Sequence, residues 1–222
     1  AAGGGTVVIP KGVYGVSATV DIPDLVGLWG AGAGANASTP AGLSCATELE
    51  WIGAAAGKMV TIGATALTAA QKGSRVGNLC LNGNDSAGYG IYMRGVNRGI
   101  YDGMVIVGMT TVGFDMDVAT GSAIGGMQYN DFQNIFIGLR SAGAATATAL
   151  KLGPGTTTSN INQNNFYNIR MSTDAGVALD CGNSDRNTFN GLTAVPLTGN
   201  SFFRAGDSAA PLTSCRKNTF IN

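Results

Sequence analysis

Apolar residues along this chain come in short clusters that are separated by Gly and Asn. Clusters bounded by such turn-forming residues predict many short strands joined by tight turns. No segment keeps the 3.6-residue period of an amphipathic helix, so helical repeats are not expected. The pattern therefore predicts an all-β chain with at most a trivial amount of helix.

One repeated unit is an Asn-x-Phe triplet followed by an apolar run. It occurs at 130–138, 164–171, 187–194 and 218–222, and a shorter relative lies at 76–83. A unit that returns every 23 to 34 residues with two short strands is too short for a four-stranded propeller blade. We expect the phenylalanines of the unit to stack in the core on one wall: Phe132, Phe166, Phe189 and Phe220.

A second unit alternates with the first from Val76 onward, and in it two apolar residues flank a third residue. Successive strand side chains point to opposite faces, so the apolar residues should point inward. These inward pairs are Ile91 and Met93, Phe114 and Met116, Leu150 and Leu152, Leu179 and Cys181, and Phe203 and Ala205. The residues between them should form an outward, mostly charge-alternating ladder: Tyr92, Asp115, Lys151, Asp180 and Arg204.

A single coil of this kind cannot bury its own apolar side chains, but stacked coils build a continuous core. The two units therefore predict a solenoid of parallel strands, each three to six residues long, with neighbouring coils ~4.8 Å apart. Asn tolerates left-handed backbone and bonds to its own copy one coil away. Two sets of Asn should form such corners: Asn78, Asn134 and Asn168, and Asn130, Asn164, Asn187 and Asn218.

The opening segment, residues 3–34, has a Gly-Gly turn, a VVIPKGVY strand and turn, an apolar strand ending in Ile22-Pro23, and an LWGAGAGA turn. In these features it resembles the first coil of the pectate-lyase-like β-helix superfamily, which includes many bacteriophage tailspikes and polysaccharide depolymerases. The resemblance implies a right-handed parallel β-helix. It implies no single activity, because this scaffold hosts lyases, hydrolases, binders and structural spikes.

We expect a single domain over 1–222. Residues 1–36 should form the first coil with the end of a capping helix, 37–75 irregular coils, and 76–222 the regular repeated coils. Those regular coils stop inside a fourth Asn-x-Phe unit, where an open coil would expose core and a strand edge. The chain is therefore expected to be an interior fragment of a longer protein.

Charge and composition exclude several function classes. The 13 basic and 13 acidic residues balance, which argues against a basic nucleic-acid-binding surface. The chain has no His, so it lacks a Ser-His-Asp triad and any His-based metal site. The four Cys have no CxxC spacing and are expected to be buried free thiols. No apolar run is long enough to span a membrane, and no cofactor is expected.

The best candidate site surrounds Asp115 and Asp117. Their side chains should project from one strand on the same outward face, ~6.5–7 Å apart, which suits the two carboxyl groups of a glycoside hydrolase. Tyr92 and Arg94 should lie one coil below and Lys151 one coil above, where they would bind the sugar. The alternative is a solvated charge ladder with no substrate, which contributes little to stability.

Other carboxylates give weaker candidates. Glu48 and Glu50 form a second pair on one strand, with Leu49 and Trp51 pointing the opposite way. A Ca²⁺-assisted lyase site would draw on a different set, namely Asp180 and Asp185 with Arg186 and Lys151. Exposed aromatic rings that stack on sugars would come from a third set: Trp29, Trp51, Tyr89, Tyr92, Tyr101, Tyr129 and Tyr167.

An outward column runs through the first unit as Cys80, Val105, Phe136 and Arg170. Its apolar middle needs a cover, from a loop or from a neighbouring subunit. That need, together with the tailspike resemblance, favours a homotrimer.

The sequence thus supports three functions. The first is a phage spike that binds cell-surface polysaccharide and, if it is an enzyme, also cleaves it. As an enzyme it is expected to be a glycoside hydrolase in preference to a Ca²⁺-dependent lyase. The second is a structural or decoration module of a virion, bound to other virion proteins and without activity. The third is a secreted polysaccharide lyase. The expected location is the virion or the extracellular space.

Overall fold

The structure is a computed structural model, which describes residues 4–34, 45–63, 71–117, 126–139, 147–153, 161–173, 176–182, 184–196, 201–205, 215 and 217–222. None of these residues is helical. Every strand pairing between them is parallel, so the predicted all-β, parallel character is confirmed.

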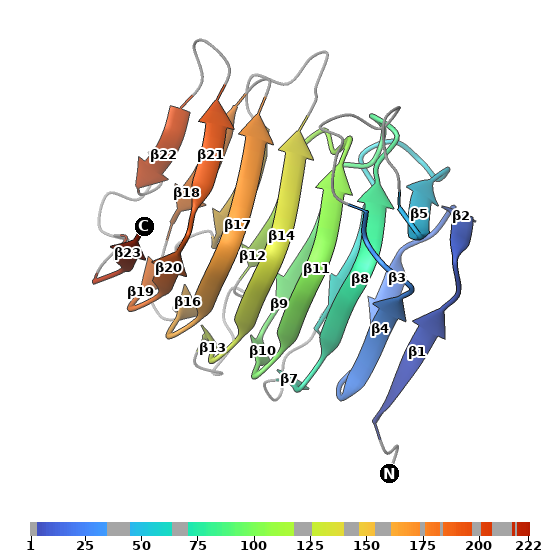
Figure 1. The fold of residues 1–222 in the computed structure, drawn as a ribbon, viewed down its shortest axis with the longest axis horizontal. Coiled ribbons are helices and arrows are strands. Elements are labelled where there is room, and N and C mark those ends of the chain that lie inside the picture. Colours follow the sequence, from blue (N-terminus) through green and yellow to red (C-terminus); the bar gives the residue numbers. More distant parts are fainter. Residues whose placement is uncertain are drawn as a thin grey trace.

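The largest sheet, sheet A, faces the viewer in Figure 1. Its main path contains β1 (Gly5–Ile9), β4 (Val26–Gly30), β8 (Arg75–Asn82), β11 (Ile100–Val107), β14 (Asp131–Leu139), β17 (Asn165–Thr173), β20 (Thr188–Asn190) and β23 (Thr219–Ile221). Three further strands pair at its upper end: β2 (Gly12–Val16), β5 (Thr47–Trp51) and β21 (Thr193–Pro196).

Sheet B lies behind sheet A in Figure 1. It contains β3 (Val20–Ile22), β6 (Lys58–Ile62), β9 (Tyr89–Arg94), β12 (Val112–Asp117), β15 (Thr148–Leu152), β18 (Val177–Cys181) and β22 (Ser201–Ala205). Two smaller sets complete the fold: sheet C, made of β13 (Met127–Gln128), β16 (Ile161–Asn162) and β19 (Ser184–Asp185), and the pair β7 (Gln71–Lys72) and β10 (Val96–Asn97).

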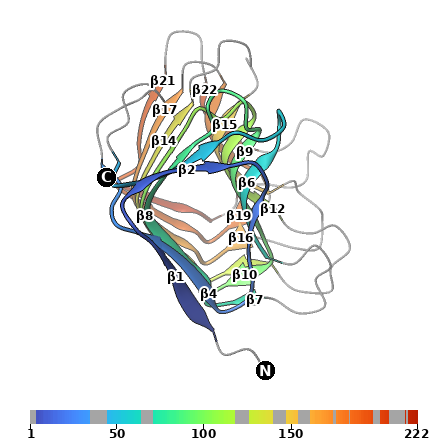
Figure 2. The ribbon, with the colours of Figure 1, turned by 90° about the vertical axis from the view of Figure 1, so that its right-hand side faces the viewer.

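The chain visits these sheets in a repeated order. From β11 it passes to β12 in sheet B, to β13 in sheet C, and back to β14, which pairs beside β11. The next turn runs through β15 and β16 to β17 in the same way. Figure 2 looks along the stack and shows the sheets around a common interior, which buried apolar side chains fill.

Stacked aromatic rings form one wall of that interior. Phe132, Phe166, Phe189 and Phe220 lie with successive ring centroids 4.6, 4.6 and 4.8 Å apart and nearly parallel planes. Tyr101 continues the stack at 4.9 Å from Phe132. The predicted stack is therefore confirmed, although Phe220 is half exposed.

The corners before β14, β17, β20 and β23 are built from Asn130, Asn164, Asn187 and Asn218. The side-chain oxygens of Asn164, Asn187 and Asn218 each accept hydrogen bonds of 2.8 to 3.0 Å from the backbone N–H and the amide of the preceding Asn, and the Asn130 oxygen accepts one from the Gly99 backbone N–H. The first three are fully buried. The predicted Asn ladder is confirmed, and it satisfies buried polar groups in the coils that it crosses.

The strands of sheet A are longer than expected. β8, β11, β14 and β17 have eight or nine residues, not three to six. The prediction was wrong because it treated Asn78, Asn134 and Asn168 as strand ends. Each of these Asn residues does adopt a φ near +52°, which kinks its strand without ending it. Gly103 has a matching positive φ at the equivalent position in β11. The strands β8, β11, β14 and β17 share the kink, so pairing between them resumes in register after it.

Sheet B follows the predicted alternation. The inward residues of β9, β12, β15 and β18 are all at most 2% exposed. Phe203 in β22 is 39% exposed and packs edge-to-face on Phe220, while the Ala205 side chain lies outside the described part. The register also extends toward the N-terminus, since β3 and β6 pair in line with β9. Residues 37–75, expected to form irregular coils, thus contribute β5 and β6.

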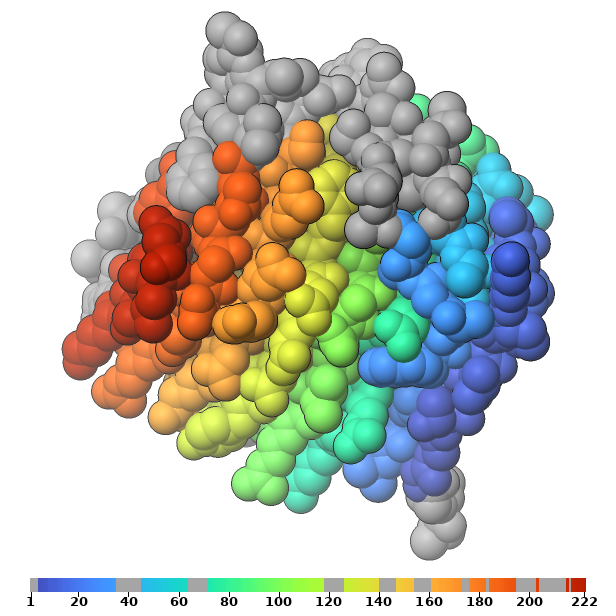
Figure 3. All heavy atoms as spheres, in the orientation of Figure 1, coloured from blue at the N-terminus to red at the C-terminus, as the bar shows by residue number. Residues whose placement is uncertain are grey.

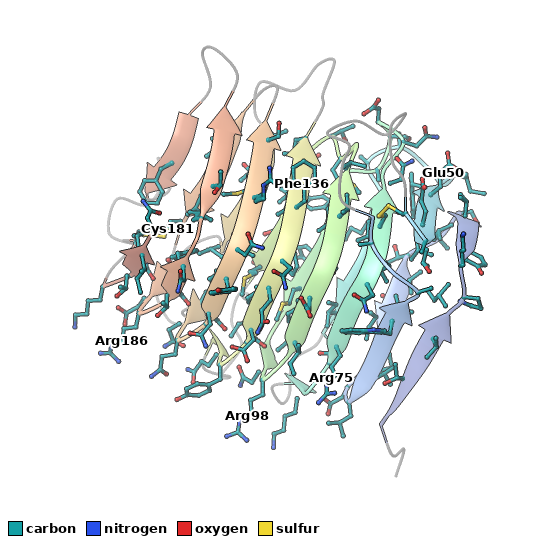
Figure 4. The ribbon with its side chains drawn as sticks, in the orientation of Figure 1. Glu50, Arg75, Arg98, Phe136, Cys181 and Arg186 are labelled. Carbon is teal, nitrogen blue, oxygen red and sulfur yellow. A yellow bond between two sulfur atoms is a disulfide. The ribbon has the colours of Figure 1, made fainter. Side chains whose placement is uncertain are left out.

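The cysteines form two disulfides, Cys45–Cys80 and Cys181–Cys215, so the expectation of buried free thiols was wrong. Partners 34 and 35 residues apart meet because one turn of the stack brings them side by side, which spacing along the chain cannot reveal. Figure 4 shows a disulfide beside β8 as a yellow bond.

Part of the outward apolar column is covered by other residues of the same chain. Cys80, Val105 and Val107 form a small cluster against which Ala33, Cys45 and Phe136 pack. Val105 is only 3% exposed, and Phe136, labelled in Figure 4, is half-buried. Ala33 and Cys45 of the same chain therefore provide cover for Val105.

Candidate functional site

The candidate site lies across three neighbouring strands of sheet B, β9, β12 and β15. Asp115 pairs in register with Tyr92 on one side and with Lys151 on the other, and Asp117 pairs with Arg94. The parallel register makes this arrangement unavoidable, because each outward residue faces its equivalent one turn away. The five residues singled out from the sequence are therefore brought together as expected.

Asp117 is held by two neighbours from β9. The Tyr92 hydroxyl donates a hydrogen bond to Oδ2 of Asp117. Arg94 Nε lies 3.6 Å from the same oxygen. Asp117 keeps 15% of its side chain exposed, so it remains reachable from solvent.

Asp115 differs from the solvated, outward residue that the alternation predicted. It is only 3% exposed, and its carboxylate lies 3.9 Å from Lys151 Nζ. The pKa of Asp115 is raised to about 6, chiefly by burial; Lys151 and Lys58 work against this rise in pKa, and Asp117 adds to it. Alternation of side chains assigns only the face of a strand, and it cannot show what else covers that face.

Tyr92 sits beneath a cation that sequence reasoning missed. Lys58 Nζ lies 3.4 Å from the Tyr92 ring centroid, and Tyr89 packs edge-to-face against the same ring at 5.9 Å. Burial and the hydrogen bond to Asp117 raise the pKa of Tyr92 well above its usual value. The Tyr92 ring is thus covered by a cation, and its hydroxyl bonds the Asp117 carboxylate. Continuing the inward pattern of Val60 and Ile62 backward would have placed Lys58 beside Tyr89.

Three polar atoms of this cluster are buried and have no hydrogen-bond partner among the described residues. They are Oδ1 of Asp115, Oδ1 of Asp117 and Nε of Arg94. Buried polar groups are nearly always paired, so these three atoms have bonding capacity that the described residues do not fill. Chemically, the cluster offers one carboxyl that is protonated near pH 6 and a second carboxylate two residues away on the same strand.

The other predicted carboxylates are arranged differently. Glu48 is largely buried and accepts a 2.8 Å hydrogen bond from Asn82, while Leu49 and Trp51 point into the core as predicted. Asp180 lies beside Lys151 in sheet B, whereas Asp185 belongs to sheet C and pairs with Arg186 at 3.5 Å. Arg186 extends outward at the lower edge in Figure 4. In the described ranges, no three acidic or Cys residues are grouped to hold a metal ion.

The seven candidate aromatic residues fall into three groups. Trp51 and Tyr101 are core residues with at most 3% exposure. Trp29, Tyr89 and Tyr92 are half-buried. Tyr129 and Tyr167 are more than half exposed, at 51% and 54%. The described part of the chain contains no helix that is long and apolar enough to cross a membrane.

Comparisons with known proteins add little to this picture. No protein-family model and no curated protein matches the sequence. Among solved structures, the chain is similar to a protein described as Geobacillus virus E2 ORF18, with a TM-score of 0.45 and 12% sequence identity. The similarity covers 98% of this chain and 53% of that one, so this chain spans about half the length of that protein.

Proposed function

We propose that this chain is a right-handed parallel β-helix of the pectate-lyase-like kind that binds and hydrolyses a polysaccharide at the sheet B cluster. The repeated parallel turns and the Asn and Phe stacks support the fold. The observation that carries the activity is the pair Asp115 and Asp117, which lie on one strand in unlike surroundings. One is buried beside Lys151 and the other is partly exposed beside Tyr92 and Arg94.

Two carboxyls in unlike environments divide the chemistry of glycosidic bond cleavage. Asp115 is the general acid, because burial keeps its carboxyl protonated to a higher pH and a protonated carboxyl can donate to the departing oxygen. Asp117, oriented by Tyr92 and Arg94, is the base that activates water or the nucleophile that attacks the sugar. Lys58 and Lys151 bring positive charge that suits an acidic sugar.

The decisive experiment is a pair of Asp→Asn variants assayed on bacterial surface polysaccharides. Asp115→Asn and Asp117→Asn keep the side-chain shape but cannot exchange the proton, so turnover should fall ~10²-fold or more while binding survives. Asp21→Asn is the matched control, because Asp21 occupies the same outward row two strands from Tyr92 and bonds only Thr61 among the described residues. Unchanged turnover in both site variants would sink the assignment.

The pH profile gives a second test. Because Asp115 must be protonated to act, turnover should decline as pH rises through about 6. EDTA should leave turnover unchanged, and an unsaturated sugar product would indicate a lyase instead. A rate that rises steadily above pH 6 would contradict Asp115 as the acid.

A structural module without substrate is the second candidate, and the burial of Asp115 favours it. A carboxylate that is 3% exposed and paired with Lys151 fits a scaffold ladder. In that case no polysaccharide is turned over, and both Asn variants change only the unfolding midpoint.

The virion or the extracellular space remains the proposed location. Disulfides persist in oxidising environments such as virion surfaces and secreted proteins, and this chain has two. Homotrimer formation and contact with other virion proteins rest on the tailspike resemblance, since other residues of the same chain cover Val105. Light scattering on the purified protein would test the proposed trimer, and a monomeric mass would contradict it.

A further inference from the structure

A second row of outward side chains crosses sheet A, a different sheet from the one that holds the carboxylate pair. The register places Trp29, Gly77, Asp102, Gln133 and Tyr167 in line across β4, β8, β11, β14 and β17. Successive residues of a strand face opposite sides of the sheet, so these positions face away from the core. The residue before each of them is buried in the core: Leu28, Val76, Tyr101, Phe132 and Phe166. Figure 3 shows this face of sheet A.

Aromatic rings stand at both ends of the row. A Cβ atom on Gly77 would lie 2.6 Å from the Trp29 ring, so the glycine leaves room for the indole to lie against the sheet. Trp29 is half-buried in this position, and Tyr167 is 54% exposed. Four strand spacings separate the two positions, which is about 19 Å.

Between the rings, polar side chains are already fixed in place. Asn168 donates a 2.9 Å hydrogen bond to Asn134, and Asn134 donates one of 2.9 Å to Asp102. Both Asn residues have φ of +52°, so their side chains leave the sheet in the same direction. No described residue takes the second amide hydrogen of either Asn. Groups ordered before a ligand arrives lose little conformational entropy when they bind it.

We propose that this surface binds a neutral, hydroxyl-rich polysaccharide laid along the stack of coils. The surface, called the sheet A platform, consists of Trp29, Asp102, Gln133, Asn134, Tyr167 and Asn168. Aromatic faces pack against the C–H face of a pyranose ring, and amide and carboxylate groups bond its hydroxyls. A polymer that spans both rings gains from several weak contacts at once.

The composition of the platform favours a glycan over a second protein copy. Stable protein interfaces have a largely apolar centre. Here the positions between Trp29 and Tyr167 hold a glycine, a carboxylate and an amide. The inference goes beyond the proposed hydrolysis, because it requires no proton transfer at Asp115 or Asp117.

The test is affinity electrophoresis of the purified chain in gels containing dextran, starch, laminarin or galactomannan. At least one polymer should retard the wild type, and Tyr167→Asn should weaken that binding about tenfold. Tyr129→Asn is the matched control: Tyr129 is 51% exposed, lies outside the platform, and has a positive φ that Asn tolerates. It should bind like the wild type.

Tryptophan fluorescence gives an independent readout. The chain has two Trp, and Trp51 is 3% exposed, so a retarding polymer should alter the emission of Trp29 and leave Trp29→Phe unresponsive. Asp117→Asn should bind normally, which separates this platform from the hydrolytic cluster. Retardation by no polymer, equal loss in both Tyr variants, loss in Asp117→Asn, or a changed oligomeric mass in Tyr167→Asn would each overturn the proposal.

Discussion

Two buried polar rows run along the same stack, and they are satisfied to different degrees. In the Asn ladder, the Asn164 oxygen accepts from the Asn130 backbone and amide, and its own amide donates to Met127 and Asn187. In the carboxylate row, Asp115 and Asp117 each keep a buried oxygen without a partner among the described residues. A row that pairs all its own groups needs nothing else. A row that leaves groups unpaired among the described residues retains bonding capacity.

The largest expected effect tests the satisfied row. Asn164→Ala should lower the free energy of unfolding by about 3 kcal/mol, because it strands the polar groups of Asn130 and Asn187 in the interior. Urea unfolding followed by circular dichroism would measure it. The neighbouring exposed Asn165, which bonds only Asp131 among the described residues, supplies the control. Asn165→Ala should lose less than about 1 kcal/mol, and an equal loss in both variants would remove the distinction.

In the carboxylate row, by contrast, we expect replacement of Asp115 to increase the free energy of unfolding at neutral pH. The folded-state pKa of Asp115, about 6, is raised above its usual value of 3.8, so the native state holds this proton more tightly than the unfolded chain. Its contribution to stability is therefore full below pH 3.8 and is lost as pH rises through 6. The loss is at most about 3 kcal/mol.

Asp115→Asn removes that pH-dependent loss. The variant should be more stable than the wild type by about 1–2 kcal/mol at pH 7, after allowance for the unpaired Lys151, and no more stable near pH 3.5. Unfolding curves at the two pH values compare the proteins directly. A variant that is less stable at pH 7 would place Asp115 among the structural ion pairs.

A smaller effect should follow the loss of the Tyr92 hydroxyl. Tyr92→Phe keeps the ring under Lys58 but removes the hydrogen bond to Asp117, so stability should fall by about 1 kcal/mol. If Tyr92 positions Asp117, kcat should fall while KM for the polysaccharide changes little. A change confined to KM would mean that Tyr92 contacts the sugar itself.

The smallest effect is expected at the edge of the cluster. Lys58→Met keeps most of the side-chain volume but removes the cation over the Tyr92 ring, which should lower stability by about 0.5–1 kcal/mol. It should also raise the pH at which turnover declines, because Lys58 lowers the pKa of Asp115. An unchanged pH profile would show that Lys58 contributes only packing.

Local patterns predicted much of the scaffold. Asn-x-Phe triplets located the aromatic stack through Phe132 and Phe166, and strict alternation placed Asp115 beside Tyr92 and Lys151. Both predictions succeed because a parallel stack repeats one local geometry in every coil. The pattern was weaker before Val76, where β5 and β6 lack the triplet, and so Lys58 was missed.

The remainder depended on neighbours that a local pattern does not contain. The alternation of residues along β12 was enough to assign Asp115 to the outward face, but its burial and raised pKa depend on groups packed there from other parts of the chain. The pairing of Cys45 with Cys80 likewise exists only because one turn of the stack returns the chain to the same place. Periodicity is a property of consecutive residues and is visible in the sequence. Desolvation and cross-linking are properties of residues brought together from a distance, so only the tertiary structure decides them.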